Sequence, residues 1–155
     1  MRRHEPQQIK GCYGEIHRLL TDYPELTVFY NGPQSGASAP DHAHFQAGLG
    51  GVLPLQTNWQ RLSRNLEEVY AESETDGIWY VNDYPCPAFL IQSRTKEADE
   101  RLFLKLYEAL SGLQKGIDEP MLNIISWRNG DDYLTVVFPR KKHRPDCYTS
   151  EDENQ

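Results

Sequence analysis

Hydrophobic side chains recur at three- and four-residue spacings in two parts of the chain, which is the spacing of one helical face. The first part covers residues 7–22 and ends before Pro24, and the second covers residues 96–112. The two apolar stripes consist of Ile9, Cys12, Tyr13, Ile16, Leu19 and Leu20, and of Leu102, Phe103, Leu106, Leu110 and Leu113. We therefore expect two helices that pack on a core through these stripes. His17 lies within the first helix, where we expect a structural role.

Short runs rich in β-branched and aromatic residues predict strands between and after the helices. These runs are residues 26–30, 77–82, 87–93, 122–127 and 133–138. Residues 62–71 fit a short helix or a strand, and the glycines and proline within residues 49–59 favour a loop. The Asn129-Gly130 pair predicts a hairpin between the last two strands. The fold class that follows is α+β, with a mostly antiparallel sheet of about five or six strands and helices packed on it.

The length, the charge and the cysteines of the chain limit its domain organisation, its partners and its location in the cell. Its 155 residues suit one domain over residues 1–148, followed by an acidic tail over residues 149–155. A net charge of -7 argues against nucleic acid and membrane surfaces as partners. No run approaches the roughly 18 apolar residues of a membrane span, and the first residues lack the apolar stretch of a signal peptide, so we expect a cytoplasmic protein. Cys12, Cys86 and Cys147 lack CxxC spacing, which favours reduced thiols over a disulfide framework.

The chemically most specific stretch follows the first predicted strand. It begins with Asn31-Gly32 and ends in an alternating segment that carries His42, His44 and Gln46. In a strand these three side chains would point to one face, and the residues between them would pack on the other. The intervening loop contains Ser35, Gly36, Ala37 and Ser38. Because small residues let backbone N–H groups approach an anion, the stretch predicts a phosphate site beside two imidazoles.

Two kinds of chemistry suit a pair of histidines. Gly36, His42 and His44 have the opening spacing of a cupin metal motif, but Gly48 and Leu49 occupy the positions where that motif expects a glutamate. We therefore expect no metal and no other cofactor, although a metal-dependent enzyme with both histidines as ligands stays an alternative. The favoured chemistry is nucleophilic attack by an imidazole on phosphorus, with Gln46 and the loop amides donating to the phosphate oxygens.

These residues resemble the histidine-triad (HIT) superfamily, in particular its galactose-1-phosphate uridylyltransferase and dinucleoside polyphosphate or GDP-hexose phosphorylase branch. The resemblance is carried by Asn31-Gly32, by the small-residue loop followed by Pro40, and by the segment from His42 to Gln46. It implies a HIT-like fold with His44 as the nucleophile. A glutamine at position 46, where the hydrolases of the superfamily carry a histidine, implies a nucleotidyltransferase or phosphorylase that works through a nucleotidyl-histidine intermediate.

The same resemblance implies the substrate class and the groups that bind it. The substrate is a nucleotide-sugar or a dinucleoside polyphosphate, and the acceptor is phosphate or a sugar phosphate. The basic segment over residues 139–145 adds candidate phosphate partners, although a solvated basic loop explains it equally well. The predicted substrate-binding residues are Asn31, Gly32, Ser35, Gly36, Ala37, Ser38, Arg140, Lys141 and His143.

Transferases of this branch contain two related halves, and the chain has the length of one. It is therefore a fragment of a longer transferase, or a chain that completes its site as a homodimer, or a domain that works alone. A nucleotide-binding module without catalysis is a further alternative. The base, the sugar and the acceptor are left open by the sequence.

Overall fold

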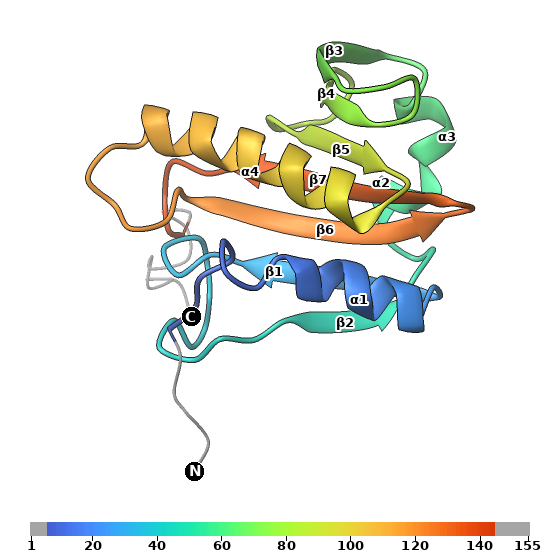
Figure 1. Ribbon diagram of the computed structural model, residues 1–155. Coiled ribbons are helices and arrows are strands. Elements are labelled where there is room, and N and C mark those ends of the chain that lie inside the picture. Colours follow the sequence, from blue (N-terminus) through green and yellow to red (C-terminus); the bar gives the residue numbers. More distant parts are fainter. Residues whose placement is uncertain (1–5, 145–155) are drawn as a thin grey trace, which may run out of the picture.

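The computed structural model describes residues 6–144, and its strands form one open sheet (Figure 1). The strands are β1 (Leu26–Asn31), β2 (Gln46–Leu49), β3 (Leu66–Ala71), β4 (Gly77–Val81), β5 (Phe89–Ser93), β6 (Leu122–Asn129) and β7 (Asp132–Pro139). Their order across the seven-stranded sheet is β2-β1-β6-β7-β5-β4-β3, and every neighbouring pair is antiparallel. The α+β class is confirmed. The expected strand number was too low because the ambiguous segment 62–71 contributes the edge strand β3.

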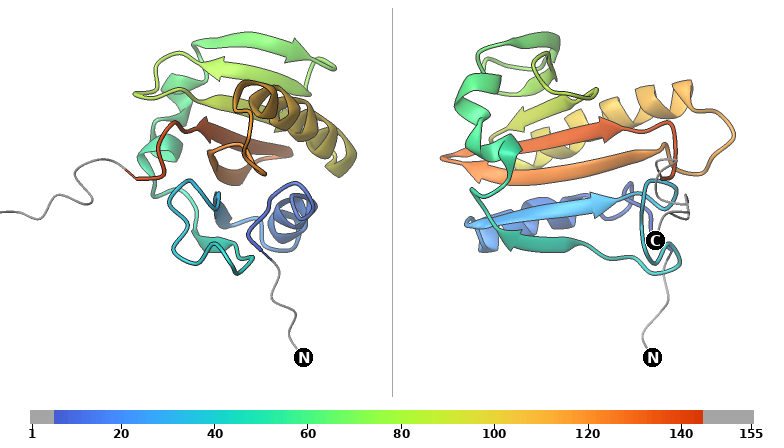
Figure 2. Two further views of the ribbon diagram at one scale, coloured as in Figure 1. Left: turned by 90° about the vertical axis from the view of Figure 1, so that its left-hand side faces the viewer. Right: turned by 180° about the vertical axis from the view of Figure 1, so that it is seen from behind.

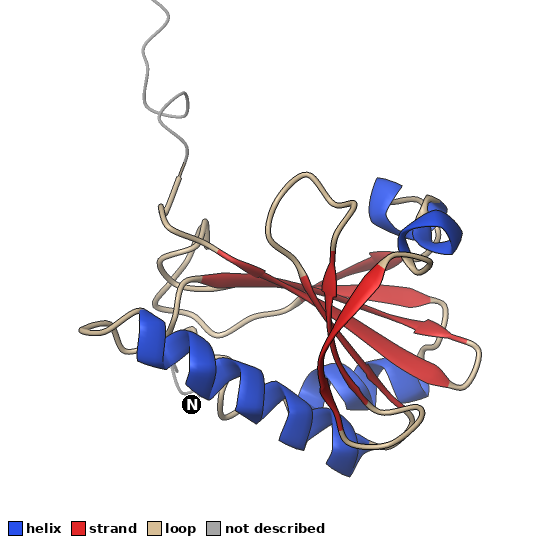
Figure 3. Ribbon diagram, turned by 90° about the horizontal axis from the view of Figure 1, so that it is seen from above, coloured by secondary structure: helices blue, strands red, loops and turns tan. Residues whose placement is uncertain are grey.

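The helices lie on both faces of the sheet. They are α1 (Gly14–Asp22), α2 (Pro54–Thr57), α3 (Trp59–Leu62) and α4 (Lys96–Leu113). The two long helices α1 and α4 cover one face, and the short helices α2 and α3 lie on the other (Figure 3). The loop expected over residues 49–59 is thus wrong in part. Pro54 opens α2, because proline suits the first turn of a helix, where its missing N–H has no partner to lose.

The first helix is shorter than its apolar stripe indicated. It begins at Gly14, because the N–H of Cys12 bonds the carbonyl of Ile9 in a tight turn that precedes the helix. The stripe nevertheless marked the buried side correctly, since Ile9 and Tyr13 lie in the core together with the helix. The second helix matches its predicted range closely, but Leu113 at its end is 82% exposed and does not belong to the core.

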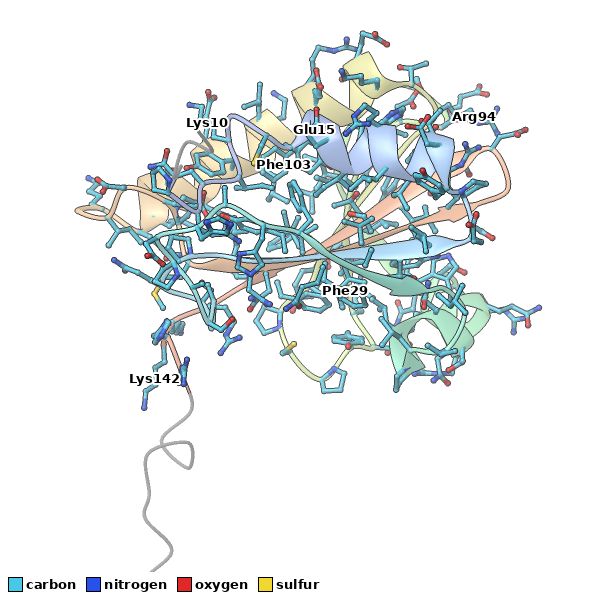
Figure 4. The ribbon with its side chains drawn as sticks, turned by 90° about the horizontal axis from the view of Figure 1, so that it is seen from below. Lys10, Glu15, Phe29, Arg94, Phe103 and Lys142 are labelled. Atoms are coloured by element: carbon cyan, nitrogen blue, oxygen red, sulfur yellow. The ribbon has the colours of Figure 1, made fainter. Side chains whose placement is uncertain are left out.

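Two hydrophobic cores lie on opposite faces of the sheet. The larger packs α1 and α4 on alternate side chains of the strands, including Val28, Tyr30 and Ile124. The smaller lies under α2 and α3 and includes Trp127 and Phe138. Figure 4 shows Phe103 on the helix-covered side and Phe29 on the opposite side of the sheet. Because side chains alternate along a strand, Asn31 and Asn123 lie on the same side as Phe29.

Both predicted hairpins are present. β6 and β7 pair up to Asn129 and Asp132, with Gly130 at a φ of 63°, a left-handed conformation that glycine adopts readily. β4 and β5 pair across the turn that contains Tyr84 and Cys86. Within residues 6–144, no helix has both the length and the apolar composition needed to span a membrane. The predicted acidic tail and Cys147 lie outside the described residues.

Candidate functional site

The predicted site residues gather at one end of the sheet. There β1 ends, β6 begins and β7 ends, so that Asn31 pairs with Asn123 and Asn123 pairs with Phe138. The loop that follows β1 extends from this end, and α2 and α3 lie at the opposite end (Figures 1 and 2). The strand ends therefore bring segments that are distant in the sequence next to the histidine stretch.

The two histidines do not lie in a strand, which corrects the sequence-based prediction. β2 begins only at Gln46, and the N–H of His42 bonds the carbonyl of Ala39 in a turn around Pro40. The expected common face of His42, His44 and Gln46 is therefore wrong. Gln46 pairs with Phe29 and is exposed, and Ala47, expected to pack inward, is exposed as well. Phe45 does pack on the core, as expected.

The backbone of His44 is held by a side chain far away in the sequence. The Oε1 atom of Gln7 accepts the N–H of His44 at 2.8 Å, and its Nε2 atom donates to the His44 carbonyl at 3.1 Å. The same Nε2 atom donates to the carbonyl of Asn31, also at 3.1 Å. Gln7 is 1% exposed, and its own N–H bonds the carbonyl of Pro40 at 3.0 Å. These contacts fix the turn and the backbone of His44 to the end of β1.

The imidazole of His44 has a defined hydrogen-bond partner. Its Nδ1 atom lies 2.7 Å from the carbonyl oxygen of His42. A carbonyl oxygen only accepts, so in the neutral ring Nδ1 carries the hydrogen and Nε2 keeps its lone pair. The His44 side chain is partly exposed. In that neutral tautomer Nε2 is the unprotonated nitrogen of a partly exposed ring at this end of the sheet.

Asn123 joins three of the predicted binding residues. Its Nδ2 atom donates to Oδ1 of Asn31 and to the carbonyl of Ser35, both at 2.7 Å. Its Oδ1 atom accepts from Nη1 of Arg140 at 2.7 Å. With Gln7 on the far side of Asn31, these bonds form a continuous chain from the backbone of His44 to the guanidinium of Arg140. We call Gln7, Asn31, Asn123 and Arg140 the amide chain.

The small-residue loop contacts the basic segment, but two of its amides already have protein acceptors. The N–H of Ser35 bonds the carbonyl of Gly32 at 2.8 Å, and the N–H of Gly36 bonds Nδ1 of His143 at 3.3 Å. Gly36 has a φ of 93°, which explains the need for glycine there. Gly36 and Ser38 are exposed, whereas Ser35 and Ala37 are buried. An anion at this loop would thus meet its exposed side, beside the imidazole of His143.

Gly32 and Glu119 support the loop from beneath. A side chain at position 32 would place its Cβ 2.9 Å from the carbonyl oxygen of Leu122, so glycine permits close packing of the loop on β6. The carboxyl of Glu119 accepts from the N–H of Ile9 at 2.6 Å and from the hydroxyl of Tyr30 at 2.7 Å. Burial raises the pKa of this carboxyl. The close approach of Gly32 to β6 and the buried hydrogen bonds of Glu119 indicate that both residues have packing roles.

A cleft of about 490 Å³ lies beside the amide chain. It is lined by Tyr84, Cys86, Asn123, Ile125, Phe138, Pro139, Arg140 and Lys141. The rings of Tyr84 and Phe138 lie with their centroids 5.3 Å apart and form an aromatic wall. The cleft thus combines aromatic surface with the cationic groups of Arg140 and Lys141, a combination that suits a ligand with a planar ring and a phosphate.

Within residues 6–144, no group of three or more histidine, cysteine, aspartate or glutamate side chains has the arrangement of a metal site. His42 and His44 are therefore not joined there by a third ligand of these types, which the metal-dependent alternative would need for a three-ligand site.

Comparisons with known proteins give a family match and a similar fold. Residues 1–49 match a family described as a domain of unknown function, DUF4922. The chain has no match among curated proteins. Its fold is similar to the crystal structure of a DUF4931 family protein from Bacillus cereus ATCC 10987, with a TM-score of 0.58 and 19% sequence identity. The match covers 86% of this chain and 64% of that protein, so the chain spans less than two thirds of its length. Neither description names the histidine-triad superfamily.

Sequence reasoning missed the residues that hold the site together. Asn123 gave a weak signal, because asparagine is unfavourable in a strand and here interrupts an apolar run. Gln7 and Glu119 gave none, since each lies in a polar stretch and acts through contacts with distant residues. Asn123 forms hydrogen bonds with three of the predicted residues, Asn31, Ser35 and Arg140. Another predicted residue, Gly36, donates its N–H to His143. Lys141 lies at the cleft.

Proposed function

We propose that the protein is a HIT-like nucleotidyltransferase or phosphorylase of the galactose-1-phosphate uridylyltransferase type. The observation that carries the proposal is the 2.7 Å contact between Nδ1 of His44 and the carbonyl of His42. It favours the tautomer of the neutral ring in which Nε2 keeps the lone pair that a nucleophile needs. The motif resemblance supports the same residue, and the cleft beside Arg140 supports a phosphate-bearing substrate.

The proposed reaction has two displacements at one phosphorus. The lone pair of His44 Nε2 attacks the α-phosphorus, the P–N bond forms, and the bond to the leaving phosphate oxygen breaks with its electron pair. An oxygen of the acceptor, phosphate or a sugar phosphate, then attacks the same phosphorus and returns the electron pair to Nε2. Gln46 donates to a phosphate oxygen, and its carboxamide cannot act as a general acid or base, which favours transfer to the acceptor over hydrolysis.

The substrate is a nucleotide-sugar or a dinucleoside polyphosphate. Its phosphates lie between His44 and Arg140, with the exposed side of the small-residue loop, Lys141 and His143 as further partners. A planar end group packs on the aromatic wall of Tyr84 and Phe138. His42 orients His44 through its carbonyl. A second copy of the chain, or a segment beyond it, completes the contacts to the other end of the substrate.

The test is incubation with a panel of UDP-, ADP- and GDP-sugars and diadenosine polyphosphates, followed by intact-mass measurement. We expect a mass increase of one nucleotidyl group with at least one member of the panel, and its absence in His44→Asn, which keeps a polar side chain. Nucleotide binding without any adduct would favour the non-catalytic module. Activity that a chelator abolishes and His44→Asn retains would favour the metal-dependent alternative.

A further inference from the structure

The side chain of Gln7 lies where β1 and β2 would pair if both strands continued. Their pairing ends at Phe29 and Gln46. Two residues beyond each of these lie Asn31 and His44, whose backbone groups would bond each other in a regular antiparallel ladder. Instead, the carboxamide of Gln7 bonds the carbonyls of both residues and the N–H of His44. Gln7 therefore bridges the point at which the two strands separate.

This arrangement separates His44 from the sheet without leaving its backbone groups unpaired. An unpaired backbone group in a buried setting costs about as much as a lost hydrogen bond, so the separation needs a substitute partner. Gln7 supplies one acceptor and two donors from a single planar group, and these pair the N–H and the carbonyl of His44 and the carbonyl of Asn31. Its burial, 1% exposed, and the bond of its own N–H to Pro40 keep that group in place.

The backbone conformation at His44 also affects the contact of its imidazole. The contact between Nδ1 of His44 and the carbonyl of His42 spans only two residues, so it depends on the local backbone conformation. That conformation is set on one side by the turn at Pro40 and on the other by the carboxamide of Gln7. Both of these anchors involve Gln7, through its carboxamide and through its own N–H.

We propose that Gln7 is a positioning residue for His44, an inference that rests on the proposed function of His44 as the nucleophile. It acts on the step in which the ring must be oriented and not on nucleotide binding, since its side chain is buried and faces backbone atoms. Its loss lowers the rate of adduct formation and leaves the concentration of substrate at half-saturation little changed.

The experiment compares Gln7→Glu and Gln7→Ala with Gln8→Glu and Gln8→Ala. Gln8 is the exposed neighbour and serves as the matched control. Single-turnover rates of adduct formation are measured from pH 5 to pH 8, together with thermal unfolding. We expect Gln7→Glu to be roughly 10- to 100-fold slower at pH 8, with half-saturation within about threefold. An ionised carboxylate has no donor for the two carbonyls, so the rate of Gln7→Glu relative to the wild type at the same pH recovers as the pH falls and the new carboxyl takes up a proton.

Two results would overturn the inference while His44 still forms the adduct. One is a rate in both Gln7 variants equal to that of the Gln8 variants. The other is a loss that the unfolded fraction explains fully, with normal turnover in the protein that stays folded and no recovery of Gln7→Glu relative to the wild type as the pH falls.

A second readout separates the inference from the proposed function. ¹⁵N NMR of the His44 ring reports its tautomer whether or not any adduct forms. We expect the Nδ1-protonated form in the wild type and in Gln8→Ala, and a mixture of tautomers in Gln7→Ala. If the wild type forms no adduct but Gln7→Ala still shows the mixture of tautomers, the proposed function is wrong and Gln7 remains the residue that orients the ring. An unchanged tautomer in Gln7→Ala overturns the role of Gln7.

Discussion

Two clusters of hydrogen-bonded polar side chains connect distant segments of this fold, and they differ in their exposure to solvent. The first lies in the core, where the Tyr13 hydroxyl is 3.1 Å from Oδ1 of Asp99 and 3.3 Å from Oγ1 of Thr135. Thr135 also lies 2.8 Å from the hydroxyl of Ser126. All of these residues are buried. The cluster joins α4 and Tyr13, the residue that precedes α1, to the central strands β6 and β7.

The second cluster is the amide chain, which connects the backbone of His44 to the side chain of Arg140, and both of these residues are partly exposed. Its members Gln7, Asn31 and Asn123 bond one another, backbone atoms or Arg140 through carboxamides. Carboxamides stay neutral at every pH, whereas the core cluster contains a carboxyl. The comparison indicates that the core cluster serves packing and that the amide chain joins the backbone of His44 to the side chain of Arg140 at the candidate site.

The largest expected effect is on the core cluster and concerns pH. Burial raises the pKa of Asp99 from 3.8 to about 7. The pKa of Asp99 is higher in the folded protein than in the unfolded chain. Its contribution to the free energy of unfolding is therefore fully present below about pH 4 and is lost as the pH rises through about 7. This difference corresponds to roughly 4 kcal/mol.

Asp99→Asn removes this pH dependence, because its amide oxygen still accepts from Tyr13 and never ionises. Urea unfolding at pH 4 and pH 8 measures the effect. The wild type should lose stability relative to Asp99→Asn between the two values, and adduct formation should stay unchanged. Parallel pH profiles in the two proteins would show that Asp99 is not a buried neutral acid.

The next effect is on the exposed end of the amide chain. Arg140→Ala removes the partner of Asn123 Oδ1 and one of the cations that line the cleft. We expect adduct formation to be about 100-fold slower, with a free energy of unfolding within about 1 kcal/mol of the wild type. Arg64→Ala is the matched control, since Arg64 is exposed and does not line the cleft. Equal rates in the two variants would remove Arg140 from the site.

The smallest effect is on the cleft beside the chain. Tyr84→Ala removes half of the aromatic wall and should weaken nucleotide binding about tenfold, because stacking contributes roughly 1 kcal/mol beyond buried area. Titration calorimetry with the nucleotide that forms the adduct measures the affinity. Tyr23→Ala, at an exposed position that adjoins α1, is the control. An unchanged affinity in Tyr84→Ala would place the base elsewhere.

The sequence predicted best those elements that depend on local patterns. α4 and the β6–β7 hairpin follow from an uninterrupted apolar stripe and an Asn-Gly turn. β3 was ambiguous because most of its side chains are exposed, so no alternation of burial marked it as a strand. The segment from His42 to Gln46 imitates a strand in its alternation, but the turn at Pro40 and the side chain of Gln7 keep its first part out of the sheet.

The candidate site was predictable only in part for the same reason. The histidines, the small-residue loop and Arg140 have recognisable chemistry, and the structure brings them to one end of the sheet. Gln7 lies 37 residues from His44 in the sequence. A hydrogen bond over that separation depends on the tertiary fold. No pattern in the polar N-terminal segment predicts that this glutamine is buried.

The most direct test of the proposed chemistry is to locate the nucleotidyl group by peptide mass mapping after an alkaline quench. The proposal predicts one modified peptide, with the group on His44, stable in base and lost in acid, as expected of a phosphorus–nitrogen bond. A group on His42, His143 or Cys86, or an adduct that forms equally in His44→Asn, would contradict it.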